Sequence, residues 1–212
     1  KNNLDLLIKS LDKKAHLDAA NAILTTDLKV KQIAYQAVIG GRRICIGGMA
    51  KGSGMIHPSM ATMLSYITCD AGVDYVLWSE MIKRVADSSF NSITVDGDTS
   101  TNDTFLAFSS GAELDPRYLS TLEEGLHITA QYLAKAIARD GEGANCLLEI
   151  KVEGAQSDLD ARVIARTIAS SSLVKTAVHG SDPNWGRIIA ALGRAGTSFN
   201  LHDVKLWIGK FF

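Results

Sequence analysis

The sequence predicts a mixed α/β fold of layered sheets and helices in one compact unit. Segments with the apolar spacing of a helix alternate along the 212 residues with short segments rich in β-branched and aromatic residues. Hydrophobic residues make up 46% of the chain and charged residues 21%, a balance that supports a substantial buried core. Only three prolines occur, and no internal repeat or low-complexity linker divides the chain, so we expect the two kinds of element to pack as layers.

The first third of the chain begins with helices and continues with strands. Leu4, Leu7, Ile8 and Leu11 recur on one face of a helix, and residues 17–24 form a second short helical segment. Strand-like segments follow. They lie at 30–38 and 43–48, on either side of the turn pair Gly40-Gly41, and again at 62–68, after a glycine-rich stretch.

Helices and strands alternate through the rest of the chain. We expect helices at 75–89, 116–139, 158–170 and 184–194, and strands at 92–95, 105–109, 146–152, 173–178 and 204–212. Ser181 or Asp182 is the expected N-cap of the last helix, which has Pro183 near its first turn. The segment 204–212 stops without a turn or cap, so we expect the natural chain to continue beyond it, and also before Lys1.

Charge and hydropathy exclude two classes of partner. Lys and Arg total 22 against 23 for Asp and Glu, which leaves no basic field for nucleic acid phosphates. No apolar run approaches the ~20 residues that cross a bilayer, and residues 1–13 lack the pattern of a signal peptide. We therefore expect a soluble protein that binds neither nucleic acid nor membrane.

The cysteines and histidines predict neither a disulfide framework nor a metal site. Three cysteines are scattered without C-x-x-C spacing, which favours small buried residues in a reducing compartment: Cys45, Cys69 and Cys146. The histidines are far apart and form no H-x-x-x-H pair: His16, His57, His127, His179 and His202. We expect no metal.

The glycine-rich stretch GGMAKGSGMIHPSMATML, residues 47–64, is the segment most suggestive of chemistry. Its glycines permit backbone conformations that other residues avoid, directly before a threonine that opens a strand. If the Thr62 hydroxyl attacks the Ala61 carbonyl and the resulting ester hydrolyses, Thr62 gains a free α-amine. That amine titrates near roughly 7.7 to 8.0, so its neutral fraction can accept the hydroxyl proton during attack on an acyl group.

Two other interpretations of this stretch were weighed. Threonine is common in strands, so the pattern alone also fits Thr62 as an ordinary strand residue. A phosphate-binding loop is excluded, because Lys51 precedes Gly52 where that motif requires a lysine after the glycine.

Several long motifs in order resemble one family. They are AILTTD at 22–27, the stretch 47–64, FNSITVDGDTSTNDT at 90–104 and SLVKTAVHGSDPNWGRI at 172–188. Together they resemble the ornithine acetyltransferases of arginine biosynthesis, also called glutamate N-acetyltransferases. The resemblance covers nearly the whole chain and implies a self-processing, N-terminal-nucleophile-type acyltransferase.

The resemblance implies a precursor that cuts itself between Ala61 and Thr62. Residues 1–61 would then be the C-terminal part of an α chain and 62–212 most of a β chain, which stay associated and pair as a dimer of αβ units. N2-acetylornithine would donate its acetyl group to Thr62, and glutamate would take it. No cofactor is required, but acetyl-CoA serves as a second acetyl donor in bifunctional members, and the sequence leaves that choice open.

The family's substrate-contacting positions fall on Thr25, Lys51, Thr62 and Glu142. Lys51 suits a substrate α-carboxylate and Glu142 the side-chain ammonium of ornithine. Without the resemblance, Lys51 and Glu142 would be interpreted as solvated surface charges and Thr25 as a helix-end residue.

The motif DGDTSTNDT, residues 96–104, resembles a calcium loop but carries Thr101 where an EF-hand requires glycine. We interpret it as a tight turn whose Asp and Thr side chains bond the backbone. The pattern alone does not place it near a site.

The family's oxyanion hole and further substrate contacts are expected before Lys1 and after Phe212. Because a missing oxyanion hole costs ~3 kcal/mol or more, residues 1–212 alone should be nearly inactive. The rival functions are a self-processing threonine amidohydrolase or aminopeptidase and an uncleaved scaffold. The compartment is a bacterial cytoplasm, a plastid or a mitochondrial matrix.

Overall fold

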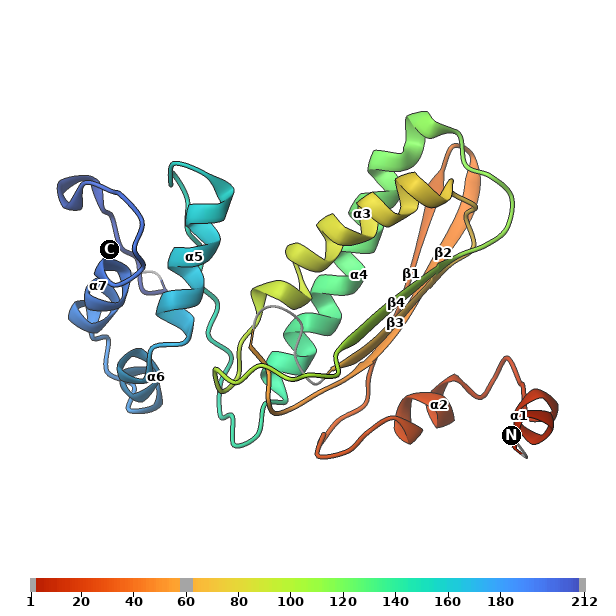
Figure 1. Cartoon of the computed structure of the whole chain (residues 1–212), viewed down its shortest axis with the longest axis horizontal. Helices are drawn as coiled ribbons and strands as arrows, with labels where there is room; N and C mark the ends of the chain where they lie inside the picture. The colour runs from red at the N-terminus through yellow and green to blue at the C-terminus, as the bar shows by residue number, and fades with distance from the viewer. Residues whose placement is uncertain (1–2, 58–62, 210–212) are drawn as a thin grey trace.

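The computed structural model describes residues 3–57 and 63–209, and its elements confirm the predicted mixed α/β fold. Figure 1 shows a sheet with α3 and α4 on one face, α5 to α7 beyond one end of it, and α1 and α2 at the other side. In chain order the elements are α1 (Leu4–Lys9), α2 (His16–Ala22), β1 (Lys31–Ile39), β2 (Arg42–Lys51), β3 (Leu64–Cys69), α3 (Tyr75–Asp87), η1 (Phe90–Ser92), β4 (Thr104–Ser109), η2 (Pro116–Tyr118), α4 (Leu119–Arg139), α5 (Asp158–Ala169), α6 (Ser172–His179), α7 (Trp185–Gly193) and η3 (Leu201–Asp203).

The four strands form one sheet in the order β1-β2-β3-β4. β1 and β2 are an antiparallel hairpin, as predicted, and its turn residues Gly40 and Gly41 have φ of 58° and 76°. Two consecutive left-handed residues match the twist of the flanking strands and favour glycine. β2 and β3 are antiparallel, whereas β3 and β4 are parallel and are connected by a crossover through α3.

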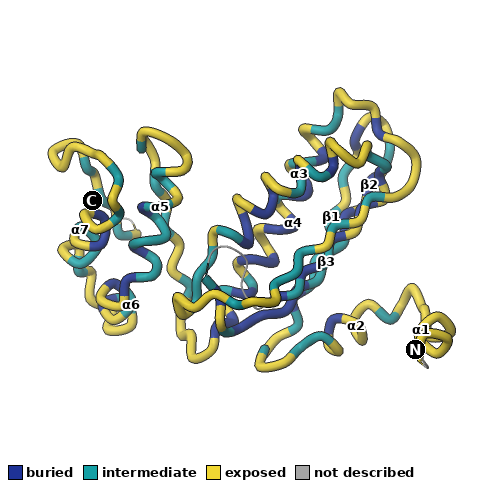
Figure 2. The backbone as a smooth tube through the Cα atoms, in the orientation of Figure 1, coloured by how far each residue is buried: buried dark blue, intermediate teal, exposed yellow. Residues whose placement is uncertain are grey.

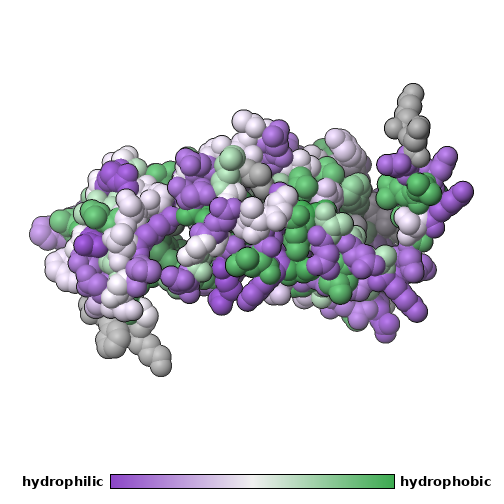
Figure 3. Space-filling view, turned by 90° about the horizontal axis from the view of Figure 1, so that it is seen from below, coloured by the Kyte–Doolittle hydropathy of each residue, from purple (hydrophilic) through white to green (hydrophobic). Residues whose placement is uncertain are grey.

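The main core lies between the sheet and α4. Leu122, Leu126, Leu133 and Ile137 are fully buried on the face of α4 that packs on β1 and β2. Figure 2 shows this buried side of the helix in dark blue. Every second strand residue points away from α4, and the outward positions in β1 and β4 leave apolar side chains exposed: Val38, Leu106 and Phe108. In the view from below, green hydrophobic surface lies in the middle part of the molecule (Figure 3).

A second, smaller core joins α5, α6 and α7. Its buried members are Ile164, Ile168, Val174, Ala191 and Leu192. Ile150 and Val152, from the segment before α5, pack against it. All the predicted helices are present within a few residues of their expected bounds.

Two predicted strands before α5 are wrong. Residues 90–92 form a 3₁₀ turn, and residues 93–95 are not part of a strand. Val95 makes one backbone hydrogen bond to another segment, from its N–H to the Ile56 carbonyl at 2.7 Å, and one such bond does not form a ladder. Residues 146–152 have no regular structure. Leu147, Ile150 and Val152 are partly buried and the other four residues are exposed, and no described strand lies beside the segment to form a ladder.

Three predictions in the C-terminal part are also wrong. Residues 173–178 are helical and belong to α6, because Ser171 caps the segment and Val174 and Ala177 are buried three residues apart. The N-cap of α7 is Asn184, whose side-chain oxygen accepts the Arg187 N–H at 3.1 Å, rather than Ser181 or Asp182. The described part of the predicted strand 204–212, residues 204–209, contains no strand.

Candidate active site

Three residues predicted to contact substrate come from distant parts of the chain; two of them are in contact, and the third lies against the loop that follows Lys51. Thr25 follows α2, Lys51 ends β2 and Glu142 follows α4. The Lys51 ammonium donates to the Thr25 hydroxyl at 3.3 Å, and the Glu142 backbone N–H donates to the Ser53 carbonyl at 2.7 Å. Lys51 is only 8% exposed, so it is no solvated surface charge, whereas Glu142 and Thr25 are exposed.

Gly54 explains part of the glycine-rich pattern. A Cβ at this position would lie 2.8 Å from both Cδ and Oε1 of Glu142. The carboxyl group of Glu142 therefore rests against the backbone of Gly54. A side chain at position 54 would push the exposed Glu142 carboxyl group away from this position.

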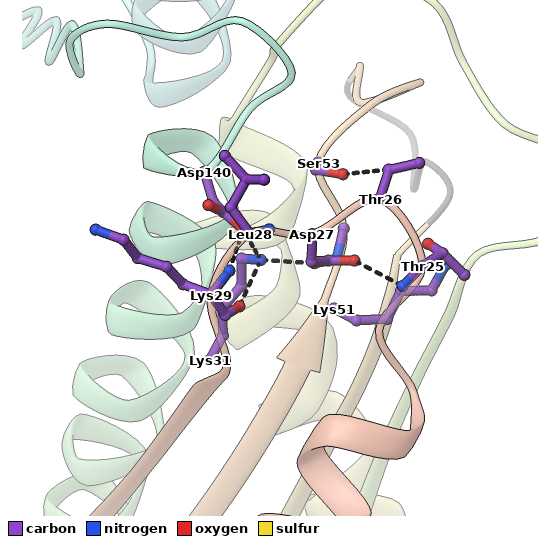
Figure 4. A network of polar contacts seen from close by, with 10 residues as sticks. Thr25, Thr26, Asp27, Leu28, Lys29, Lys31, Lys51, Ser53 and Asp140 are labelled. Carbon is purple, nitrogen blue, oxygen red and sulfur yellow. Dashed lines mark hydrogen bonds and ion pairs between the residues drawn. The ribbon is translucent and has the colours of Figure 1, made fainter.

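A buried ion cluster beside Thr25 and Lys51 is formed by Asp27, Lys31 and Asp140 (Figure 4). The Lys31 ammonium is 2.6 Å from Asp27 Oδ1 and 2.6 Å from Asp140 Oδ2. The side chains of this cluster are between 0% and 6% exposed. A buried cation with a carboxylate on either side is tolerated because each charge is paired and hydrogen-bonded.

The carboxylate of Asp27 joins the Thr25 loop to the glycine-rich loop. It accepts the Gly52 N–H at 2.7 Å and the Thr25 N–H at 3.3 Å. The hydroxyls of Thr26 and Ser53 share a further hydrogen bond of 2.6 Å between the same loops. The backbone on which Lys51 and Thr25 meet is thus fixed by side chains that face away from solvent.

The carboxylate of Asp140 joins the end of α4 to the same region. Its Oδ2 accepts the N–H groups of Leu28 and Lys29 at 3.0 and 3.2 Å, in addition to the Lys31 ammonium. Since Glu142 lies two residues beyond Asp140, the ion cluster sets the position of the third candidate residue as well.

Electrostatics lower the pKa of Asp27. Burial acts in the opposite direction and is the largest single influence. The hydrogen bonds from Lys31, Gly52 and Thr25, with the positive charge of Lys31, together outweigh it. Asp27 therefore remains a carboxylate at neutral pH.

Asp103, in the turn motif, binds the backbone of Met63, the residue that follows the predicted nucleophile in the sequence. Its Oδ1 accepts the Met63 N–H at 2.8 Å. Burial raises the pKa of Asp103, and the Met63 hydrogen bond and the Lys51 charge only partly offset that effect. Ala61 and Thr62, the predicted cleavage site, lie outside the described residues.

The sequence analysis missed the supporting carboxylates and Lys31. Asp27 and Lys31 are four residues apart, but they do not share a helix, so the usual helical pairing signal does not apply. Asp140 is separated from Lys31 by 109 positions, and no local pattern could connect them. Within the described ranges, no group of three or more His, Cys, Asp and Glu side chains is placed to hold a metal, and no helix is long and apolar enough to cross a bilayer.

Comparison with known proteins gives consistent matches. The chain is 89% identical over 210 residues to the arginine biosynthesis bifunctional protein ArgJ of Prochlorococcus marinus (strain NATL2A), covering 99% of this chain and 50% of that protein. The protein of the same name from strain MIT 9313 is 62% identical over 206 residues, with coverage of 97% and 48%. The chain thus spans about half the length of the curated relatives it matches.

A solved structure and a family model agree with these relatives. The crystal structure of arginine biosynthesis bifunctional protein argJ from Bacillus halodurans superposes with a TM-score of 0.62 at 42% identity, over 66% of this chain and 68% of that one. The model of the ArgJ family matches residues 1–212. The chain belongs to the ArgJ family.

Proposed function

We propose that the whole protein is an acetyltransferase of arginine biosynthesis that moves the acetyl group of N2-acetylornithine to glutamate. The observation that carries the proposal is the contact of Lys51 with Thr25, with Glu142 bound to the adjacent loop at Ser53. Family membership and the name shared by the relatives support the same activity.

The proposed mechanism has two stages, both at Thr62. In the first, the hydroxyl attacks the Ala61 carbonyl and the peptide bond breaks, which frees the Thr62 amine and leaves Ala61 esterified to the Thr62 oxygen; water then hydrolyses this ester, which restores the hydroxyl and releases the Ala61 carboxylate. In the second, that amine takes the hydroxyl proton while the oxygen attacks the acetyl carbonyl, and the proton passes to the departing ornithine nitrogen. The neutral amine of glutamate then attacks the acetyl ester, which releases N-acetylglutamate and restores the threonine.

We assign binding roles to the three neighbouring residues. Lys51 is a buried cation, and a substrate α-carboxylate would pair with it more strongly than it would in bulk water. Glu142 is exposed and carries the charge needed for the side-chain ammonium of ornithine. Thr25 holds the Lys51 ammonium through its hydroxyl and so orients it. No cofactor is needed for these steps, and acetyl-CoA is a second acetyl donor if the protein is bifunctional, as its relatives are named.

The proposed partners are the two amino-acid substrates and the protein's own products. Residues 1–61 and 62–212 belong to the α and β products of the cut, and two αβ units form a dimer. The relatives are bacterial, which favours the bacterial cytoplasm over a plastid or mitochondrion. The balanced charge supports neither a nucleic acid nor a membrane partner.

Product analysis of the full-length protein tests the activity. With N2-acetylornithine and glutamate, ornithine and N-acetylglutamate should appear in equal amounts. Free acetate as the main product would favour the rival hydrolase, in which water resolves the acyl-threonine. Mass spectrometry of acetyl-loaded protein should find the label on Thr62, and a label on any other side chain would refute the mechanism.

A further inference from the structure

Lys51 and Glu142 carry opposite charges on neighbouring backbone but do not pair with each other. The carboxyl group of Glu142 lies against Gly54, three residues after Lys51. The Lys51 ammonium donates to the Thr25 hydroxyl, and neither charge belongs to an ion pair in the described part of the chain. The Asp103 carboxyl group and Lys51 interact at longer range, through charge alone. A ligand that carries both a carboxylate and an ammonium would satisfy both unpaired charges.

Each of the two charges is held in place by a different buried carboxylate (Figure 4). Asp27 accepts the N–H of the residue directly after Lys51 at 2.7 Å. Asp140 is the C-cap of α4, two residues before Glu142, and its Oδ2 binds two backbone N–H groups in the loop before β1. Both carboxylates also bind the ammonium of Lys31, which therefore joins the loop of Lys51 to the end of α4.

The cluster contains more negative charge than Lys31 requires. One carboxylate would neutralise its ammonium, but Asp27 and Asp140 both lie 2.6 Å from it, with side chains that are 0% and 6% exposed. Burial of a second carboxylate is unfavourable even where backbone N–H groups offset part of the penalty. In some proteins such buried ionic groups are retained because they fix one arrangement of the surrounding elements. Charge balance alone does not explain why both carboxylates are present.

We propose that Asp27 and Asp140 are positioning residues which, through Lys31, fix the separation between the Lys51 ammonium and the Glu142 carboxylate, and that this separation selects the length of the acetylated diamino acid. The inference rests on the proposed function, in which Lys51 binds the α-carboxylate and Glu142 the side-chain ammonium of N2-acetylornithine. A longer or shorter diamino acid would satisfy one of these charges but not both.

The acetyl donor and the acetyl acceptor depend on this separation differently. N2-acetylornithine carries a carboxylate and a side-chain ammonium, so it uses both charges. Glutamate has no side-chain ammonium and uses only Lys51. Displacement of Glu142 should therefore weaken binding of the donor alone, whereas displacement of Lys51 should weaken binding of both substrates.

Steady-state kinetics of the full-length protein, after its cleavage has been verified by denaturing gel, test the inference. N2-acetyllysine serves as a donor that is one methylene longer. In the wild type we expect kcat/KM for N2-acetylornithine to exceed that for N2-acetyllysine by about tenfold or more, the usual effect of one methylene in a closely fitting site. Asp140→Ala loosens the end of α4, so we expect this ratio to fall to about threefold or less.

The KM values distinguish the two carboxylates. Asp140→Ala should raise KM for N2-acetylornithine about tenfold and leave KM for glutamate within about twofold, because only the Glu142 side is displaced. Asp27→Ala should raise KM for both substrates about tenfold, because it releases the backbone beside Lys51. Each alanine variant leaves Lys31 with one carboxylate, so no buried charge remains unpaired.

Two further variants separate positioning from folding. Asp140→Asn keeps an acceptor at Oδ2, the atom that receives every hydrogen bond of this side chain from described residues, so its donor ratio and KM values should stay within about threefold of wild type. Arg139→Ala is the matched control and should behave as wild type. Arg139 precedes Asp140 and is exposed, and its side chain makes no hydrogen bond or ion pair within residues 3–57 and 63–209.

The outcomes are distinguishable. A wild-type donor ratio in Asp140→Ala overturns the inference, and so does an equal rise in KM for donor and glutamate in that variant. If Asp140→Ala does not fold, Asp140→Glu keeps the charge and displaces the end of α4 by the length of a methylene, and a wild-type ratio in that variant overturns the inference too. A wild type that uses both donors equally well also overturns it. If the wild type makes no N-acetylglutamate from N2-acetylornithine, the proposed function itself fails, whatever the variants do.

Discussion

At the scale of single residues, Lys51 offers the most direct test of substrate binding. Lys51→Met removes the buried cation and keeps most of the side-chain volume. We expect KM to rise roughly tenfold or more for both N2-acetylornithine and glutamate, since a hydrogen bond to a charged group contributes ~1.5 kcal/mol or more. Steady-state kinetics of the full-length protein measure this, with the exposed Lys83→Met on α3 as control. Unchanged KM values for both substrates would refute the pairing.

The buried ion cluster gives a second prediction at this scale. Lys31→Met leaves Asp27 and Asp140 buried without a countercharge, which we expect to lower the free energy of unfolding by ~3–5 kcal/mol at neutral pH. Urea unfolding of full-length protein carrying Thr62→Ala measures this on an uncut chain. The control is Lys151→Met. Lys151 and Glu153 form a pair whose side chains are 80% and 74% exposed, and its loss should change stability by about 1 kcal/mol or less.

The free energy of unfolding of the uncut protein with Lys31 and that of its Lys31→Met variant should change in opposite directions as the pH falls. The pKa of Asp27 lies below its ordinary value of 3.8, so the stability it contributes is complete above that pH and is lost as the pH falls through the folded-state pKa. Without Lys31, burial of Asp27 is no longer offset by the Lys31 hydrogen bond and charge, so its pKa rises, and the variant should gain stability as the pH falls from neutral toward 5. A constant difference between the two proteins across this range would contradict the assignment of the charges.

At the scale of elements, α6 shows how a short apolar run misleads. The sequence LVKTAV alternates well enough to predict a strand, but its buried members Val174 and Ala177 are one helical turn apart. We expect Val174→Asp and Ala177→Asp each to destabilise by roughly 3 kcal/mol or more, and Leu173→Asp, at a 58% exposed position, by about 0.5 kcal/mol or less. Chemical unfolding measures this. A large loss for Ala177→Asp with little loss for Val174→Asp would instead support a strand, in which those two residues lie on opposite faces.

The remaining element errors have the same physical origin. Residues 146–152 and 93–95 have the β-branched composition of strands, yet a strand also needs a neighbour whose N–H and C=O groups complete the ladder. Apolar composition indicates only that side chains avoid water, and Ile150 and Val152 do so by packing partly buried against the core of α5 to α7. The long helix α4 was predictable, because its apolar stripe over many turns leaves no competing period.

At the scale of the whole molecule, the pairing of strands in the sheet predicts that the two products of a cut before Thr62 would stay associated. β2 lies in the α product and pairs antiparallel with β3 in the β product, and α4 of the β product covers β1 and β2. The products share one core, so we expect two bands on a denaturing gel but a single species on size exclusion in native buffer. The Thr62→Ala variant should give one band on the denaturing gel and a single species on size exclusion. Separation of the products in native buffer would contradict the shared core.

The candidate site shows which features local sequence patterns can predict and which they cannot. Thr25, Lys51 and Glu142 were assigned by resemblance of whole motifs, and the turn at residues 96–103 was recognised as a turn. That two of these residues are in contact and the third lies against the adjacent loop, that Asp27, Lys31 and Asp140 support them, and that Asp103 binds Met63 could not be predicted. Each of these contacts joins residues separated by 25 or more positions, apart from the Asp27–Lys31 pair.

The class of fold, the hairpin at Gly40-Gly41, most helices and the family motifs could be predicted from the amino-acid sequence, because they depend on periodicities and residue types within a few turns of chain. Three features required the folded structure: which strands pair, whether Lys51 is buried or solvated, and which carboxylates bind Lys31 and Met63. Those outcomes depend on burial and on the pairing of charges across the core, and neither is a property of any short segment.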